Sequence, residues 1–249
     1  MIIVDNIPQG SFEWLKARLH RLTASEFYKV LTSEGVLSKS EAARNHILGL
    51  CAAVQISDEY LEKCAELDDW KLKKALCHYT GDSFAGNVHT ERGHEFEPEA
   101  VAKVAEKHGV DLQPVDMVIM GDSPDGVISC SPDAWAHDER IGCEAKNPTL
   151  KGFFEVLHND EVDPKHVLQV HGSMAVCEVD HWIYCSHFTG YPVFSKVVER
   201  NDLTNRIEDS LHEARDWYEE LLLETYERLD QIEKPIEAII PQQQIEDIL

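Results

Sequence analysis

The spacing of apolar residues predicts helices through the first half of the chain. Residues 11–31 carry a partial apolar face, which predicts a helix and then a second short helix beginning near Thr23. Residues 38–80 are rich in Ala, Leu, Glu and Lys, which predicts further helix with a structural role. After a loop at residues 80–87, a new apolar face predicts a helix over residues 94–108, with the glycine that follows as its C-terminal stop.

The second half of the chain adds the alternation that is typical of β-strands. Residues 116–146 contain short hydrophobic runs separated by turn residues, which predict an antiparallel meander. Residues 181–188 and 192–199 predict a hairpin, and a helix that starts at Asp163 would cover the sheet. A long amphipathic helix over residues 202–231 would pack on the same sheet. The pattern as a whole predicts a mixed α/β fold.

Composition favours one domain of a reduced, cytoplasmic protein. With 249 residues and 43% hydrophobic content, the chain is long enough for one well-packed core. It has no apolar run of membrane-spanning length and begins without a signal-peptide pattern, so we expect no membrane association. The seven cysteines include no CxxC pair, and we expect them to be reduced and mostly buried. The wide spacing of Cys51, Cys64 and Cys77 predicts no iron–sulfur cluster, and His166 and His171 are poorly spaced for a shared zinc site.

The net charge restricts how the protein contacts nucleic acid. Its formal value of −23 opposes loose coating of DNA, since non-specific affinity comes from Lys and Arg side chains that neutralise phosphates. Residues 11–30 are nevertheless locally basic, with Lys16, Arg18, Arg21 and Lys29 against two glutamates. We therefore expect an acidic exterior around a small positive contact surface.

An acid, a turn and an acid–x–lysine triplet lie close together in the predicted meander. Side chains two residues apart on a strand point to the same face, so Glu144 and Lys146 would share one site. A turn through residues 137–140 would fold the strand after Asp133 back beside Glu144. Two carboxylates suit Mg²⁺, and a nearby lysine could orient or deprotonate a metal-bound water. This arrangement fits phosphodiester hydrolysis.

Neither part of this pattern is specific when taken alone. Acid–x–lysine occurs at residues 69–71, 144–146 and 163–165, and an exposed ion pair is the commoner explanation of one such triplet. Only the triplet that contains Glu144 lies on a predicted strand. Ser-Pro-Asp also occurs twice, and we favour Asp133 because strand-like residues follow it, whereas Asp125 precedes a glycine and is the better turn former. Asp125 remains the second candidate.

Two predicted helix starts supply further polar candidates. Glu97 either complements a helix dipole or adds a third carboxylate, and the proline after it is tolerated only near a helix start. Thr23 lies three residues before a glutamate, which is capping-box spacing. The free amides of that short helix could instead receive a phosphate, with Ser25 and Arg18 as side-chain donors.

Four short blocks, taken together and in order, carry a family resemblance. They are EWLKARLHRLTASE at 13–26, RGHEFEPEA at 92–100, CSPDAW through GCEAKNP at 130–148, and HVLQVHGSM at 166–174. The chain resembles the lambda-exonuclease-like, or YqaJ-type, viral recombinase nucleases, a branch of the PD-(D/E)xK superfamily. The resemblance implies an α/β (α+β) restriction-endonuclease-like core with a central mixed β-sheet flanked by helices. It implies a single nuclease domain over residues 1–249, divided into an N-terminal helical part at 1–90, a catalytic core at 91–200, a C-terminal helix at 201–235 and a tail at 236–249.

The resemblance also implies roles for individual residues. Asp133 and Glu144 would bind Mg²⁺ together with the carbonyl of Ala145, and Glu97 would complete the acidic cluster. Lys146 would activate the attacking water. We expect Mn²⁺ to substitute for Mg²⁺.

Other matched positions extend this site and show some departures. Gln169 would line it from the covering helix. Three residues resemble the family's pocket for a DNA 5′ phosphate: Arg18, Ser25 and Ser131. Ala134 replaces the usual glycine and Asn147 stands where members often have cysteine, but every implied metal ligand is present.

The activity implied by the resemblance is a Mg²⁺-dependent 5′-to-3′ exonuclease. It would act on the ends of linear double-stranded DNA and leave 3′ single strands for a phage-type single-strand annealing protein. Similar enzymes form ring-shaped trimers, so we expect a homo-oligomer, phage-encoded or prophage-derived, in the cytoplasm of a bacterial host. Two alternatives stay open: a restriction- or repair-type endonuclease with the same core, and a non-catalytic DNA-end-binding recombination scaffold.

Overall fold

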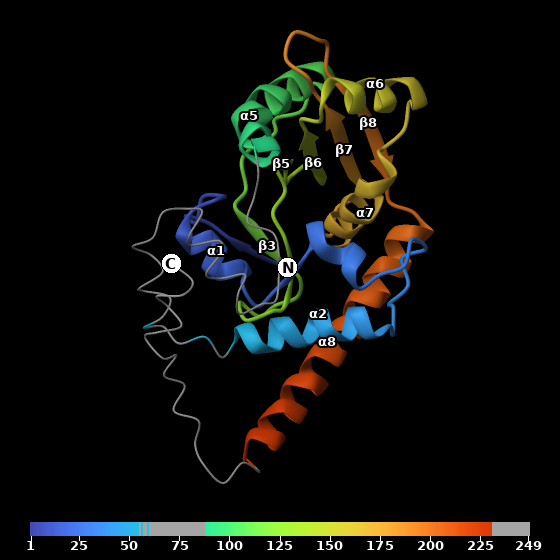
Figure 1. The fold of residues 1–249 in the computed structure, drawn as a ribbon. Coiled ribbons are helices and arrows are strands. Elements are labelled where there is room, and N and C mark those ends of the chain that lie inside the picture. Colours follow the sequence, from blue (N-terminus) through green and yellow to red (C-terminus); the bar gives the residue numbers. More distant parts are fainter. Residues whose placement is uncertain (55, 57–58, 60–87, 231–249) are drawn as a thin grey trace.

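The computed structural model of the chain describes residues 1–54, 56, 59 and 88–230 (Figure 1). The predicted loop at 80–87, most of the predicted helical segment beyond residue 54 and the predicted tail lie outside the described residues. Within α5, side chains are described from Phe96 onward.

The predicted pair of helices near the N-terminus is confirmed, and the second of them is a 3-10 helix. The elements are β1 (Ile2–Val4), α1 (Phe12–Arg18), β2 (Leu22–Thr23), η1 (Ala24–Lys29) and α2 (Glu41–Ala53). Ser11 caps α1, where its side chain accepts a hydrogen bond from the N–H of Trp14. Thr23 is the N-cap residue of η1, as its spacing predicted, but its side chain makes no capping hydrogen bond. Its hydroxyl instead accepts a hydrogen bond from Arg18 at 3.0 Å.

The helix predicted at 94–108 begins earlier than expected. The structure gives α5 as Val88–His108, with Pro98 inside it rather than near its start. Proline lacks the N–H that would bond to the carbonyl four residues earlier, so this turn has one backbone hydrogen bond fewer. Gly109 adopts φ +66° and ends the helix as predicted. Ala100 and Val104 are buried against the strands that carry the polar candidates described below.

The predicted meander is divided between two sheets. In the described residues the strands form one four-stranded sheet, in the order β1-β3-β4-β2, and a second in the order β5-β6-β7-β8. Their bounds are β3 (Met117–Ile119), β4 (Ile128–Cys130), β5 (Ala134–Ala136), β6 (Ile141–Lys146), β7 (His181–Ser186) and β8 (Phe194–Glu199). The chain leaves the first sheet at Ser131–Asp133, where Pro132 cannot donate to a ladder. A single continuous meander was therefore the wrong expectation, although β3–β4 and β5–β6 are each antiparallel.

The connections around the second sheet agree with the sequence pattern. Strands β7 and β8 form the predicted hairpin. Strand β6 pairs in parallel with β7, and the crossover between them contains α6 (Leu150–Asn159), η2 (Pro164–His166) and α7 (Val167–Val176). Asp163 caps η2 as predicted, since its side chain accepts from the N–H of Lys165 at 3.2 Å.

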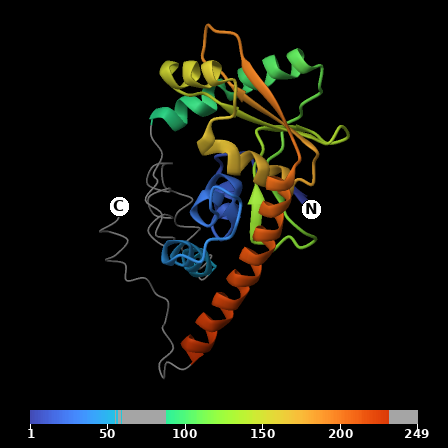
Figure 2. The same ribbon diagram turned by 90° about the vertical axis from the view of Figure 1, so that its right-hand side faces the viewer.

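Helix α7 lies at the centre of the fold. It contacts η1, β4, β6, β7 and the long helix α8 (Asp202–Asp230). Helix α8 packs against α7 and α2 and extends away from the sheets (Figure 2), so the prediction that it packs on its own sheet is wrong. The apolar face of α8 is covered by helices because α7 already occupies this side of the core.

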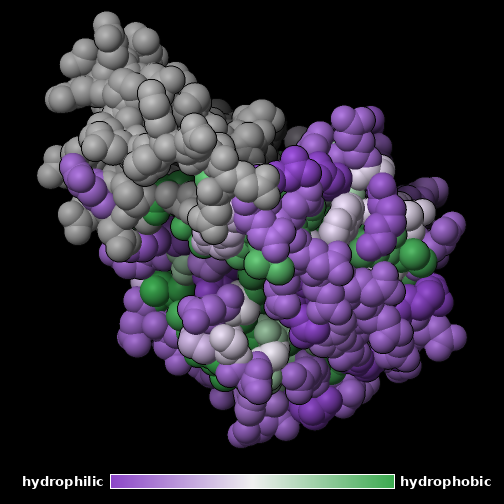
Figure 3. Space-filling model, turned by 90° about the horizontal axis from the view of Figure 1, so that it is seen from below, coloured by the Kyte–Doolittle hydropathy of each residue, from purple (hydrophilic) through white to green (hydrophobic). Residues whose placement is uncertain are grey.

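Two cations of the locally basic segment, Arg21 and Lys29, are engaged by other groups of the protein. Arg21 is only 6% exposed and donates to the carbonyl oxygens of Pro124 and Gly126 at 2.7 and 2.9 Å. Lys29 pairs with Glu26 at 2.6 Å. Seen from below, the described surface is largely hydrophilic, with apolar side chains in small areas (Figure 3). The cysteines at positions 51, 130, 143, 177 and 185 are free and buried, in line with the expectation for them. None of the helices in the described part of the chain is both long and apolar enough to cross a membrane.

Close packing between α7 and η1 generates a test of this core. A Cβ added at Gly172 would lie 2.3 Å from Cδ2 of the buried Phe27. We expect Gly172→Ala to lower the free energy of unfolding by at least about 1–3 kcal/mol, as measured by urea denaturation. Gly152→Ala in α6 is the matched control, since its nearest contact would be 3.2 Å away, and it should change stability less. Equal effects of the two substitutions would contradict this account.

Candidate active site

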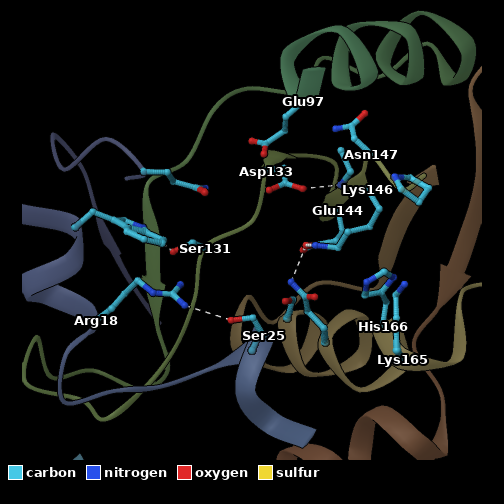
Figure 4. Close-up of a pocket in the computed structure, with 17 residues that line it drawn as sticks. Arg18, Ser25, Glu97, Ser131, Asp133, Glu144, Lys146, Asn147, Lys165 and His166 are labelled. Atoms are coloured by element: carbon cyan, nitrogen blue, oxygen red, sulfur yellow. Dashed lines mark hydrogen bonds and ion pairs between the residues drawn. The ribbon is translucent and has the colours of Figure 1, made fainter. Parts of the chain in front are cut away.

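All nine residues selected from the sequence line one pocket of about 570 Å³ (Figure 4). They come from distant parts of the chain: Arg18, Ser25, Glu97, Ser131, Asp133, Glu144, Ala145, Lys146 and Gln169. The second candidate aspartate, Asp125, does not line this pocket and lies in an exposed turn. The structure therefore places Asp133, and not Asp125, beside the acid–x–lysine strand.

Strand pairing brings Asp133 and Glu144 to the same site. Strands β5 and β6 pair with Ala134 opposite Cys143, and the chain reverses at the predicted turn, where Arg140 has φ +56°. This pairing puts the Asp133 carboxylate next to the backbone of β6, and its Oδ2 accepts from the N–H of Ala145 at 2.6 Å. Glu144 and Lys146 project together from the same strand, as the two-residue period requires.

The Glu144 carboxylate is buried and only partly satisfied. Its residue is 2% exposed, and its Oε1 accepts hydrogen bonds from Gln169 Nε2 at 2.6 Å and from Lys146 Nζ. Its Oε2 is buried without a hydrogen-bond partner among the described residues. A buried carboxylate oxygen without a partner is costly, so this atom indicates a position for a cation or a bound water.

Burial and neighbouring carboxylates disfavour the charged forms of Asp133 and Glu97. Burial raises the pKa of Asp133 well above its ordinary value, and the charges of Glu144 and Glu97 add to this effect. Burial and then the charge of Glu144 raise the pKa of Glu97 to about 7, against an opposing effect of Lys146. Burial alone would lower the pKa of Lys146, but the charges of Glu144 and Asp133 outweigh it and raise this pKa. The Lys146 side chain is therefore an ammonium group at neutral pH in the metal-free protein.

These donors suit a hard divalent cation although they are not arranged as a complete cage. Among the described residues, no group of three His, Cys, Asp or Glu side chains is positioned to hold a metal ion. The reason is that Glu144 turns toward Lys146 and Gln169, while Asp133 turns toward the N–H of Ala145. Mg²⁺ commonly uses only one or two carboxylates and completes its coordination with water and phosphate oxygens. Asp133 and Glu144, with the unpartnered Oε2, fit that requirement.

A cluster of hydrogen-bond donors surrounds Arg18 at another side of the pocket. Arg18 Nη2 donates to Ser25 Oγ at 3.2 Å, and its guanidinium lies 4.2 Å from the centroid of the Trp14 ring. Trp14 Nε1 donates to Ser131 Oγ at 3.0 Å. Burial lowers the pKa of Arg18, with Glu26 opposing, yet a guanidinium stays charged in proteins. Trp14 thus joins the three predicted residues, although the sequence had placed it only on an apolar helix face.

The sequence also missed polar residues on the side of η2. Lys165 and His166 line the pocket just before α7. Lys165 had been considered only as part of a capped helix start, and His166 only as a zinc candidate. Each lies about one helical turn before Gln169, so helical spacing is the signal that could have grouped them with it. Asn147, noted only as a family departure, lines the pocket too.

The fold and this pocket together define the class of protein. A mixed sheet that presents an acid–x–lysine strand beside a second acid, covered by a glutamine-bearing helix, is the PD-(D/E)xK type of fold. The chain belongs to the YqaJ-like viral recombinase family, whose model matches residues 13–191. Both the expected family and the expected fold class are thereby confirmed.

Solved exonuclease structures share this fold. The alkaline exonuclease LHK-Exo from Laribacter hongkongensis is 21% identical, with a TM-score of 0.57 over 86% of this chain and 98% of that chain. The same protein in complex with dAMP gives a TM-score of 0.58 at 20% identity. A phage-related exonuclease from Haemophilus somnus 129PT is 17% identical, with a TM-score of 0.50 over 82% of this chain and 96% of that chain. No curated protein matches the sequence.

The crowding of carboxylates predicts a pH-dependent stability of the metal-free protein. The pKa of Glu97 is about 7 in the folded state against an ordinary value of 4.5, so the folded state holds a proton that the unfolded state has released, and stability falls as the pH rises through this window. Glu97→Gln removes this loss. We expect it to raise the unfolding free energy at pH 8 in EDTA by roughly 1–2 kcal/mol after solvent screening, and by less at pH 4.5. Glu106→Gln, an exposed change on the same helix, should have little effect; a pH-independent difference for Glu97→Gln would refute the explanation.

Proposed function

We propose that the protein is a Mg²⁺-dependent exonuclease that degrades one strand of linear double-stranded DNA from 5′ to 3′. The observation that carries this proposal is the convergence of all nine expected residues on one pocket. The family match and the fold shared with alkaline and phage-related exonucleases support a nuclease. One of these relatives has been crystallised with dAMP, a nucleotide that a DNA exonuclease would release.

The side chains of the pocket divide the work of phosphodiester hydrolysis. Arg18, Ser25 and Ser131 bind the 5′ phosphate through charge-assisted and neutral hydrogen bonds, with Trp14 holding Arg18 and Ser131 in place. When bound by Asp133 and Glu144, Mg²⁺ supplies Lewis acidity and a water of lowered pKa.

The remaining groups orient this centre. Gln169 fixes Glu144, and the N–H of Ala145 fixes Asp133. The Lys146 ammonium, on the same face as Glu144, orients the attacking water and an oxygen of the scissile phosphate. Glu97, with its raised pKa, faces these groups from α5 as the third acid.

The family match also motivates a proposal about the wider setting of the activity. We propose that the product is a 3′ single-stranded overhang, which a phage-type single-strand annealing protein uses for recombination. A trimeric ring would also reconcile a net charge of −23 with DNA binding, because it confines the cations to a channel around the substrate.

Linear and closed circular DNA test the proposed reaction directly. We expect loss of a linear 5′-phosphorylated duplex in Mg²⁺ or Mn²⁺, no attack on a closed circle, and no reaction in EDTA. Lys146→Ala should slow the reaction about 10²–10³-fold, because it removes the ammonium that orients the reacting groups beside Glu144. Lys107→Ala, an exposed lysine at the end of α5, is the control and should keep wild-type activity.

The same assay separates the alternatives. Cutting of the circle by wild-type protein, abolished by Lys146→Ala, would establish an endonuclease. Binding of DNA ends without any cleavage would establish a scaffold. If Lys146→Ala degrades linear DNA as fast as wild type, the reaction takes place at another site.

The proposed 5′-phosphate pocket is tested by changing the DNA end. We expect Arg18→Ala to lower kcat/KM on a 5′-phosphorylated duplex by about 10–100-fold, since it removes a charge-assisted contact. The same variant should affect a 5′-hydroxyl duplex far less, so its preference for phosphate disappears. Arg215→Ala, which removes an exposed arginine paired with Asp216, is the matched control. An equal loss on both DNA ends would mean that Arg18 does not bind the terminal phosphate.

A further inference from the structure

One cation of the pocket has no role in the reaction described so far. The lining residues comprise three acids, Glu97, Asp133 and Glu144, and three bases, Arg18, Lys146 and Lys165. Arg18 is assigned to the 5′ phosphate and Lys146 to the reacting centre. Lys165 is the remaining base, and it lies in a protein whose surplus of negative charge makes each cation near DNA valuable.

Lys165 lies across the reacting centre from Arg18. In the close-up, Arg18 and Ser131 occupy one side of the pocket, His166 and Lys165 the other, and the Glu144–Lys146 pair lies between them (Figure 4). A DNA strand that places its terminal phosphate at Arg18 and its first internucleotide phosphate at Lys146 therefore continues toward Lys165. A cation on that side offsets the repulsion between the next phosphate and the carboxylates of the pocket.

The Lys165 ammonium is accessible and has donors to spare. Its side chain is 64% exposed, and its Nζ lies 2.9 Å from Asp163 Oδ2. An ammonium group has three N–H donors, so one contact with Asp163 leaves others for a ligand. An exposed pair of this kind contributes little to stability, so Asp163 orients the lysine without preventing it from binding a phosphate.

The ring of His166 lines the pocket beside this ammonium. Its Nδ1 lies 3.1 Å from the Tyr184 hydroxyl, with which it shares a hydrogen bond. Which of the two groups donates depends on the tautomer of the ring. Burial lowers the pKa of His166 to about 3, with Lys146 and Lys165 adding to the effect, so the ring is neutral at physiological pH and carries one N–H donor and one acceptor nitrogen.

We propose that Lys165, with His166 beside it, forms a second phosphate-binding site for the phosphate on the 3′ side of the scissile phosphodiester. The pocket then holds three successive phosphates of one strand: the terminal one at Arg18, the scissile one at Lys146 and the next one at Lys165. This inference rests on the proposed function for its assignment of the first two positions.

A neutral phosphate analogue tests the contact at one position. Two short 5′-phosphorylated duplexes are compared, one of them with a methylphosphonate at the second internucleotide position of the cleaved strand. Wild-type protein should lose about 10-fold in kcat/KM on the methylphosphonate duplex, because a charge-assisted contact is removed. On the unmodified duplex, Lys165→Ala should have a kcat/KM lower than that of wild type by a similar factor. The methylphosphonate should then lower the kcat/KM of Lys165→Ala by less than about 2-fold further. Lys165→Arg, which retains the charge, should keep the wild-type pattern.

Two controls define the outcome that would overturn the inference. Lys151→Ala removes an exposed lysine from α6 that is paired with Glu155, and it should keep the wild-type penalty for methylphosphonate. A methylphosphonate two positions further along should give the same small effect in wild type and in Lys165→Ala. If Lys165→Ala retains the full wild-type penalty at the second position, Lys165 does not bind that phosphate.

Equilibrium binding in EDTA separates this inference from the proposed function. Failure of every variant to cleave any duplex would overturn the nuclease proposal. The affinities of the same two duplexes, measured by fluorescence anisotropy, would still decide the second site. Loss of the methylphosphonate penalty in Lys165→Ala supports the site, and an unchanged penalty overturns it.

Discussion

The burial of the Glu144 carboxylate is the constraint on which the rest of the structure depends. A charge that is 2% exposed needs partners from several directions, and no single element supplies them. Lys146 comes from the same strand, and Gln169 reaches across from α7. One oxygen still lacks a protein partner among the described residues, so the fold leaves a deficit at the point where a cation would bind. This oxygen without a protein partner lowers the stability of the fold, and it is part of a preorganised site.

Helix α7 links the burial of Glu144 to the packing of the rest of the fold. Gln169 reaches Glu144 only if α7 lies close to the sheets, and the lack of a side chain at Gly172 permits the contact with Phe27 that holds η1 against α7. Element η1 carries Ser25, so the same packing also positions the neighbourhood of Arg18. Helix α8 then covers the far side of α7. The metal-binding candidates and the phosphate-binding candidates are thus parts of one packed unit.

The sequence predicted local features well because they depend on local physics. The two-residue period placed Glu144 and Lys146 on one face, and turn chemistry after Asp133 predicted the reversal that pairs β5 with β6. The sequence-based predictions failed for features that depend on tertiary contacts. The division of the strands into two sheets, the packing of α8 on helices and the engagement of Arg21 by loop carbonyls have no periodic signal. The grouping of nine residues came from family blocks, whereas Trp14 and Lys165 were missed because an apolar face and a helix cap explained them adequately.

The distribution of cations explains how so acidic a protein can act on DNA without coating it. The basic residues near the N-terminus do not form a general DNA-binding surface, since Arg21 holds a loop and Lys29 pairs with Glu26. The pocket, in contrast, matches its three acids with three bases. In the proposed function, a phosphate chain that threads between Arg18 and Lys165 would be attracted there, whereas the net charge of −23 opposes its binding elsewhere. Under the proposed function, a continuous duplex could not place a terminal phosphate at Arg18, so this arrangement of charge would favour DNA ends over internal sites.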